Sequence, residues 1–244
     1  MRETTEDREF VIGVIGGMGP MATADFLAKL TTATPVTKEQ EHLRVLIDSN
    51  PKIPDRNSAL LGDGESPANA IAQTARNLQH CGADFLVMAC NTAHAFENAV
   101  RHAVSIPFVS MIDEASDACL RLHPNARRMG LLAAPGCLNA GLYQTAIARR
   151  DRDTVALSER QQADFASLLY QIKTRGVSDA VRDGMKALGD ALIDAGADVL
   201  IAACTEVPLV LSDGDLRRPV IDATSNLAAR CVRYARRIET IPSL

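Results

Sequence analysis

The 244-residue chain lacks the hallmarks of several protein classes. It has no long basic run, and its formal net charge of -4 argues against nucleic-acid binding, which draws its affinity from neutralised phosphates. Its apolar runs are far shorter than the ~20 residues of a membrane-spanning helix. The first ten residues are charged and polar, so we expect no signal or transit peptide and a cytoplasmic location. A hydrophobic content of 47% excludes wholesale disorder.

The cysteines lack the spacing of a metal site. There are six of them: Cys81, Cys90, Cys119, Cys137, Cys204 and Cys231. None forms a pair two to four residues apart, and the five histidines do not cluster beside them, so we predict no bound metal. Because nothing else indicates export, we expect free thiols rather than disulfides. A cysteine without further context is most often a small buried hydrophobic residue, so a functional role needs additional evidence.

That evidence comes from an internal repeat around two of the cysteines. Residues 82–92 (GADFLVMACNT) resemble residues 196–206 (GADVLIAACTE), with Cys90 and Cys204 in register. A continuous apolar run of this length is typical of a strand buried on both faces of a parallel sheet. Each thiol then lies at the carboxyl end of its strand, where ligands bind in open α/β sheets.

Two weaker repeats support the division of the chain into halves. Residues 10–17 and 128–136 each read as a buried strand that runs into a glycine-containing loop, and residues 107–113 resemble residues 219–222. Three repeats in the same order predict two similar halves.

Between the strands, apolar periodicity predicts helices over residues 22–33, 66–80, 183–194 and 224–238. Alternating strands and helices favour βαβ units. We therefore predict an α/β fold of two doubly wound, flavodoxin-like parallel-sheet domains related by pseudo-twofold symmetry, with the active site in the cleft between them.

The last predicted helix follows the final repeat and is expected to pack back on the first half. We accordingly assign residues 1–113 plus 219–244 to an N-terminal domain that carries Cys90. Residues 114–218 form a C-terminal domain that carries Cys204.

One thiol on each wall of a cleft suggests proton transfer. A thiolate is a good base, and stereoinversion at carbon needs one base to remove a proton from one face while an acid delivers a proton to the other. His94, one turn beyond Cys90, is expected to pack or to support the site rather than to act as a base.

Several motifs resemble those of the aspartate/glutamate racemase family, which comprises cofactor-independent enzymes with two catalytic cysteines. The motifs are GGMGP at residues 16–20, SNPKIPDR at 49–56, CNTAH at 90–94, LYQIK at 169–173 and CTE at 204–206. The cysteine motifs are shared with glutamate and hydantoin racemases, whereas GGMGP and IPDR point to the aspartate racemase branch. The resemblance covers nearly the whole chain.

The resemblance implies that Cys90 and Cys204 are the catalytic acid and base. It implies a substrate-binding set of Gly17, Met18, Gly19, Asn50, Arg56, Asn91, Thr92, Cys137, Lys173, Thr205 and Glu206. The guanidinium of Arg56 suits a side-chain carboxylate. Where the family has a Thr-x-Gly-Thr pattern, this chain has Ala134 to Cys137, which removes two hydroxyl groups and leaves the preferred amino acid open.

The expected function is isomerisation: racemisation of aspartate, glutamate or a similar amino acid, without pyridoxal phosphate or any other cofactor. We expect a homodimer with no nucleic-acid or membrane partner. Two alternatives remain open: an isomerase or decarboxylase of small dicarboxylates on the same scaffold, and a catalytically inactive amino-acid-binding protein. Retention of both thiols disfavours decarboxylases that keep only one.

Overall fold

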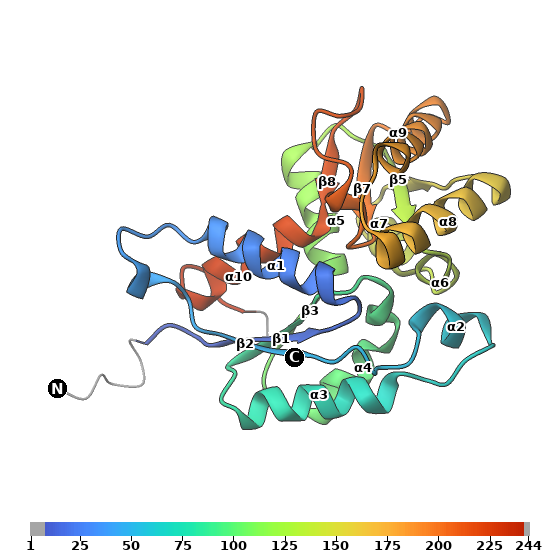
Figure 1. The fold of residues 1–244 in the computed structure, drawn as a ribbon. Helices are drawn as coiled ribbons and strands as arrows, with labels where there is room; N and C mark the ends of the chain where they lie inside the picture. The colour runs from blue at the N-terminus through green and yellow to red at the C-terminus, as the bar shows by residue number, and fades with distance from the viewer. Residues whose placement is uncertain (1–7, 242–244) are drawn as a thin grey trace.

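Two parallel four-stranded sheets organise the molecule (Figure 1). The computed structural model describes residues 8–241, so residues 1–7 of the polar N-terminal segment, and the corresponding part of the leader-peptide prediction, lie outside the described residues. Within residues 8–241, no helix combines the length and apolarity that crossing a bilayer requires.

The first sheet has the strand order β2-β1-β3-β4. Its strands are β1 (Ile12–Gly16), β2 (Val45–Ser49), β3 (Phe85–Met88) and β4 (Phe108–Val109). Helix α1 (Pro20–Ala33) covers one face, and α3 (Ala68–His80) covers the other, beside α4 (Glu97–Ala103) (Figure 1). Two short segments, η1 (Glu39–Glu41) and α2 (Arg56–Leu61), lie in the connections on either side of β2.

The second sheet repeats this order as β6-β5-β7-β8. Its strands are β5 (Arg128–Ala133), β6 (Asp153–Val155), β7 (Val199–Ala203) and β8 (Val220–Asp222). The flanking helices are α5 (Met111–Leu122), α6 (Pro135–Asn139), α7 (Leu142–Ala148), α8 (Glu159–Arg175) and α9 (Asp179–Asp194). The shared strand order confirms the predicted fold of two similar α/β halves.

The repeated Gly-Ala-Asp sequence has a physical role at the start of β3 and of β7. Gly82 and Gly196 end the preceding helices at φ +94° and +96°, a left-handed conformation that favours glycine. The carboxylate of Asp84 then accepts the backbone N–H of Val11 at 2.6 Å, and that of Asp198 accepts the N–H of Arg128 at 3.0 Å. The same motif thus supplies a carboxylate that binds a backbone N–H at the start of the neighbouring strand in both halves.

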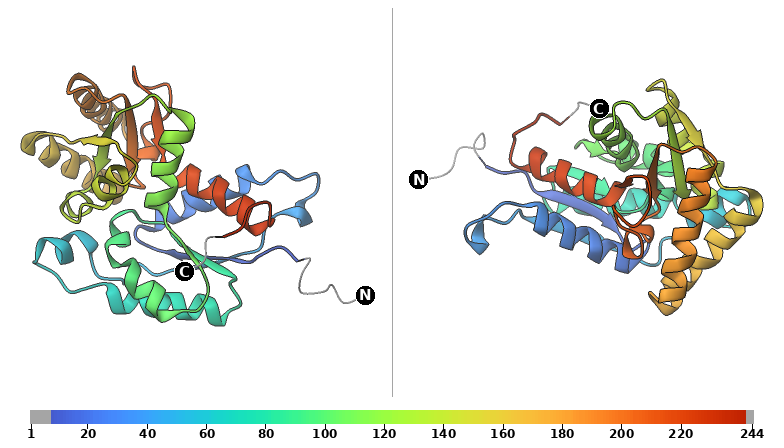
Figure 2. Two further views of the ribbon diagram at one scale, coloured as in Figure 1. Left: turned by 180° about the vertical axis from the view of Figure 1, so that it is seen from behind. Right: turned by 90° about the horizontal axis from the view of Figure 1, so that it is seen from above.

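The final helix, α10 (Ala223–Ala235), packs against α1 of the first half and also against α5 (Figure 2). One apolar core runs through these helices and joins β1 and β3 to β5 and β7. Strand β8 pairs with β7 in the second sheet, although residues 219–244 were assigned to the N-terminal domain. The domain boundaries at residues 113 and 218 stay a prediction.

The helix ends differ slightly from the expected ones, for local reasons. α9 begins at Asp179 rather than 183 because the hydroxyl of Ser178 caps it by accepting the N–H of Val181. α3 begins two residues later than expected, and α10 ends three residues earlier than expected, just before Arg237 takes a positive φ of 57°.

Candidate active site

The two repeated cysteines lie at equivalent ends of the two central strands. Cys90 follows β3 after one residue, and Cys204 follows β7 directly. A short 3-10 turn comes after each thiol, η2 (Thr92–Phe96) in the first half and η3 (Val207–Leu209) in the second. Both cysteines are only 6% exposed. They line one cavity, so the structure brings together the predicted catalytic pair.

This thiol cavity is small and draws its walls from both halves. Its volume is about 10 Å³, room for about one water molecule. It is lined by Met18, Arg56, Asn57, Cys90, Asn91, Thr92, Ala134, Lys173, Cys204, Thr205 and Glu206. Apart from Asn57 and Ala134, all of these belong to the site predicted from the sequence.

Cys204 is held by a carboxylate. Its Sγ donates to Oε2 of Glu206 at 3.0 Å, and Nζ of Lys173 lies 3.5 Å from Oε1 of the same residue. Burial raises the pKa of Cys204 well above its ordinary value, and the negative charge of Glu206 raises it further, while Lys173 opposes the effect. Cys204 is therefore a protonated thiol at neutral pH.

Lys173 is charged in this arrangement. Burial lowers its pKa, but the negative charge of Glu206, and then the charge that each cysteine carries when ionised, raise it by more, so that its pKa lies above the ordinary lysine value. The ammonium group therefore stays positive beside the thiols and partly balances the carboxylate.

His94 supports the first thiol without competing as a base. Its Nδ1 lies 2.9 Å from the carbonyl oxygen of Cys90, and its Nε2 accepts the backbone N–H of Met111 at 3.0 Å. Both ring nitrogens are thereby occupied, with the proton on Nδ1. Burial lowers the pKa of His94, so the ring is neutral. It ties the turn that follows Cys90 to the start of α5.

Asn91 lines the cavity and has an amide nitrogen without a protein partner. Its Oδ1 accepts the hydroxyl hydrogen of Tyr143 at 2.6 Å, which fixes the orientation of the amide. Its Nδ2 is buried and has no protein partner. Because a buried donor without an acceptor is costly, this amide is suited to a ligand oxygen. Thr92 and Thr205, buried beside the two thiols, line the same cavity.

Arg56 begins α2 and is held by backbone carbonyl groups. Its Nη1 donates to the carbonyls of Ile53 and Pro54 at 3.3 and 3.1 Å, and its Nη2 to that of Met18 at 3.3 Å. Its Nε is buried without a protein partner. The guanidinium is thus fixed between the two loops of the first half, with the Nε donor available to an anionic group.

The remaining predicted residues lie outside the thiol cavity. Gly19 lines an adjoining chamber. Gly17, at φ +87°, contacts the backbone of Asn50 so closely that an added Cβ would lie 2.4 Å from its nitrogen, so both shape the loops under the site. Cys137 is buried in the core; burial, and then the charge of Cys90, raises its pKa to about 12. Direct substrate contact by these four residues stays a prediction.

The site residues predicted from the sequence include neither Asn57 nor Tyr143. Oδ1 of Asn57 accepts the backbone N–H of Gly136 at 3.0 Å and joins α2 to the loop after β5. The only signal for Asn57 was its place next to Arg56. The contact of Tyr143 with Asn91 joins residues of different halves, and no local pattern encodes such a pairing.

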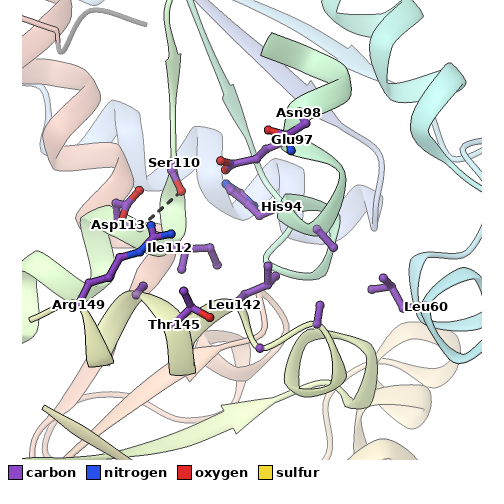
Figure 3. Close-up of a pocket in the computed structure, with 14 residues that line it drawn as sticks. Leu60, His94, Glu97, Asn98, Ser110, Ile112, Asp113, Leu142, Thr145 and Arg149 are labelled. Atoms are coloured by element: carbon purple, nitrogen blue, oxygen red, sulfur yellow. Dashed lines mark hydrogen bonds between the residues drawn. The ribbon is translucent and has the colours of Figure 1, made fainter. Parts of the chain in front are cut away.

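A second cavity of about 390 Å³ lies between η2, α5 and α7 and contains no cysteine. Figure 3 shows His94 and Glu97 on one wall and Thr145 and Arg149 on the other. Asp113 pairs with Arg150, and Glu97 pairs with Arg101, so the carboxylates here already have partners. Elsewhere in the described residues, too, no three His, Cys, Asp or Glu side chains gather as metal ligands.

Comparison with known proteins decides the family. The sequence pattern of the Asp/Glu/hydantoin racemases matches residues 15–231. The chain belongs to this family. Membership of the Asp/Glu/hydantoin racemase family places it among the isomerases and agrees with the resemblance seen in the motifs.

Individual relatives cover most of the chain. The broad specificity amino-acid racemase RacX of Bacillus subtilis (strain 168) is 25% identical over 228 residues, which span 91% of this chain and 96% of RacX. The structure of Picrophilus torridus aspartate racemase is similar with a TM-score of 0.83 at 30% identity, over 93% of this chain and 94% of that one.

More distant members share the fold. Glutamate racemase from Campylobacter jejuni subsp. jejuni has a TM-score of 0.61 at 17% identity, over 96% of this chain and 88% of that one. This likeness shows that the two structures share a fold.

Proposed function

We propose that this protein racemises an acidic amino acid by a two-thiol mechanism that uses no cofactor. The observation that carries the proposal is the placement of Cys90 and Cys204, which end equivalent strands of the two halves and line one cavity. The similarity to aspartate racemase and to RacX supports an amino acid as the substrate.

The unsatisfied donors support a carboxylate ligand. Nδ2 of Asn91 and Nε of Arg56 are buried without protein partners, and both residues line the cavity. We assign the α-carboxylate to Asn91, Thr92 and Thr205, beside the thiols. We assign the side-chain carboxylate to Arg56 and Lys173, whose positive charges suit it.

The reaction then needs only proton transfers. The thiolate of one cysteine removes the Cα proton, and the electron pair moves into the α-carboxylate to give an enediolate-like carbanion. The thiol of the other cysteine protonates the opposite face. Donors from Asn91 and the two threonines, in a cavity that excludes bulk water, stabilise the charge that develops on the carboxylate.

The hydrogen bond between Cys204 and Glu206 sets the starting state. Because Cys204 is the protonated partner, Cys90 is the base for one enantiomer, and transfer of the proton from Cys204 prepares the site for the other. Glu206 accepts the hydrogen bond of the Cys204 thiol, and Lys173 balances the negative charge as the proton leaves.

We propose a cytoplasmic homodimer. The free state of all six cysteines supports a reducing compartment.

The proposal is tested by incubating the purified protein with L- and D-aspartate and L- and D-glutamate in deuterated water, followed by chiral chromatography and mass spectrometry. We expect inversion without added pyridoxal phosphate or metal, with deuterium in the inverted product from the first turnovers and unconverted substrate still protiated. Loss of CO₂ would indicate a decarboxylase, and binding without exchange an inactive amino-acid-binding protein. Dependence on added pyridoxal phosphate or metal would contradict the mechanism.

A further inference from the structure

A chamber of about 340 Å³ adjoins the thiol cavity. Arg56, Lys173 and Glu206 line both spaces and therefore form the neck between them. The thiol cavity itself has room for about one water molecule, so an amino acid held with its Cα between the thiols has to place a long side chain elsewhere. The neck leads from the thiols to a space that is large enough for such a side chain.

The walls of the chamber are largely apolar. They include Pro20 and Met21 of α1, Ile172 of α8, Val177 after α8, and Leu209 of η3. Met21 is 73% exposed and Val177 is 43% exposed, so both present apolar surface to water at this site. Because the walls come from both halves, the chamber depends on the same arrangement that places the two thiols together.

The charged groups around the chamber balance one another. Lys173 pairs with Glu206 at 3.5 Å, and Asp55, the neighbour of Arg56, also lines the chamber, so the lining carries two positive and two negative side chains. A neutral side chain that passes the neck leaves these charges balanced. A carboxylate carried beyond the neck would instead face Asp55 and an apolar wall, which a charged group disfavours.

We propose that this chamber is a side-chain pocket for long, unbranched apolar amino acids, so that the protein racemises this neutral class as well as acidic amino acids. The inference rests on the proposed proton transfer at Cys90 and Cys204 and extends its range of substrates. The α-carboxylate lies at Asn91, the Cα lies between the thiols, and the tail passes the neck to contact Met21 and Val177.

A homologous series tests the chamber. We would measure kcat/KM for α-proton exchange in deuterated water, by NMR, for 2-aminobutyrate, norvaline, norleucine and 2-aminoheptanoate, with aspartate in parallel. Each methylene buried is worth about 0.8 kcal/mol, or about fourfold in kcat/KM. We expect kcat/KM to rise by about this factor per methylene once the tail passes the neck.

Variants locate the effect. Met21→Gln and Val177→Asn change exposed side chains and should flatten the rise with chain length. Leu122→Gln changes an exposed apolar residue at the end of α5, 54% exposed against 73% for Met21 and 43% for Val177; it should leave the rise intact and serves as the matched control.

The outcomes separate this inference from the proposed function. Exchange of aspartate with a flat or falling series overturns the chamber pocket alone, as does a rising series that neither chamber variant alters. A rising series without exchange of aspartate or glutamate supports the pocket and refutes the acidic substrate. Failure of the folded protein to exchange any amino acid overturns both.

Discussion

Replacement of Glu206 by glutamine removes the negative charge that faces Cys204. In the structure the thiol donates to this carboxylate at 3.0 Å, and the charge of Glu206 adds to burial in raising the pKa of Cys204. Glutamine keeps the size of the side chain and a hydrogen-bonding oxygen, but it no longer repels a thiolate. The substitution also leaves the ammonium group of Lys173, 3.5 Å from Glu206, without its counter-charge. Both changes favour the ionised form of Cys204.

The sign and size of the effect follow from this contact. Racemisation requires one of the two cysteines to keep its proton. Activity therefore falls at alkaline pH, where the second of the two thiol protons is lost. The raised pKa of Cys204 makes its thiol the group that loses this proton. A hydrogen bond to a charged group is worth about 1.5–3 kcal/mol, which corresponds to about one to two pH units. Glu206→Gln should therefore move the alkaline limb of kcat/KM to lower pH by about this amount.

The assay is the pH profile of kcat/KM from neutral to alkaline pH, with both enantiomers. The ratio of the two kcat/KM values is fixed by the equilibrium constant, so both profiles should move together. Glu114→Gln is the matched control, because Glu114 is also buried and ion-paired, with Arg230 at 2.6 Å in the core. An alkaline limb that stays in place in Glu206→Gln, or moves upward, would refute the role of Glu206.

Two further predictions address the binding groups. Tyr143→Phe should free the amide of Asn91 and lower kcat/KM by about tenfold, chiefly through KM, because a buried hydrogen bond of this kind is worth about 1–2 kcal/mol. Unchanged steady-state kinetics together with a lower melting temperature would contradict this positioning role. Arg56→Ala should cost about 1–3 kcal/mol in kcat/KM for aspartate and little for alanine, which lacks the second carboxylate, and equal losses on both substrates would place Arg56 outside the side-chain site.

The fold was accessible from the sequence because its main features are local and repeated. Continuous apolar runs identify the central strands. The Gly-Ala-Asp motif recurs because in both halves its glycine ends a helix and its aspartate binds a backbone N–H at the start of the neighbouring strand. The position of each thiol at the end of a strand follows directly from the run that precedes it.

The site was predicted less completely because part of it depends on contacts between the halves. Asn57 and Tyr143 reach the site through partners far away in the sequence, Gly136 and Asn91. Cys137 departs from the family motif, and its side chain belongs to the apolar core and is not among the residues that line the thiol cavity, so its contact with substrate stays a prediction.

The most direct test of the central claim is the enantiomer preference of the two single-cysteine variants. Cys90→Ala and Cys204→Ala should each abolish racemisation in both directions, because each direction uses both groups. Each variant should retain α-proton exchange, or elimination of a good β-leaving group, for one enantiomer only, and the two variants should prefer opposite hands. The same preference in both variants, or near-normal racemisation in either, would contradict the assignment of Cys90 and Cys204 as opposed acid and base.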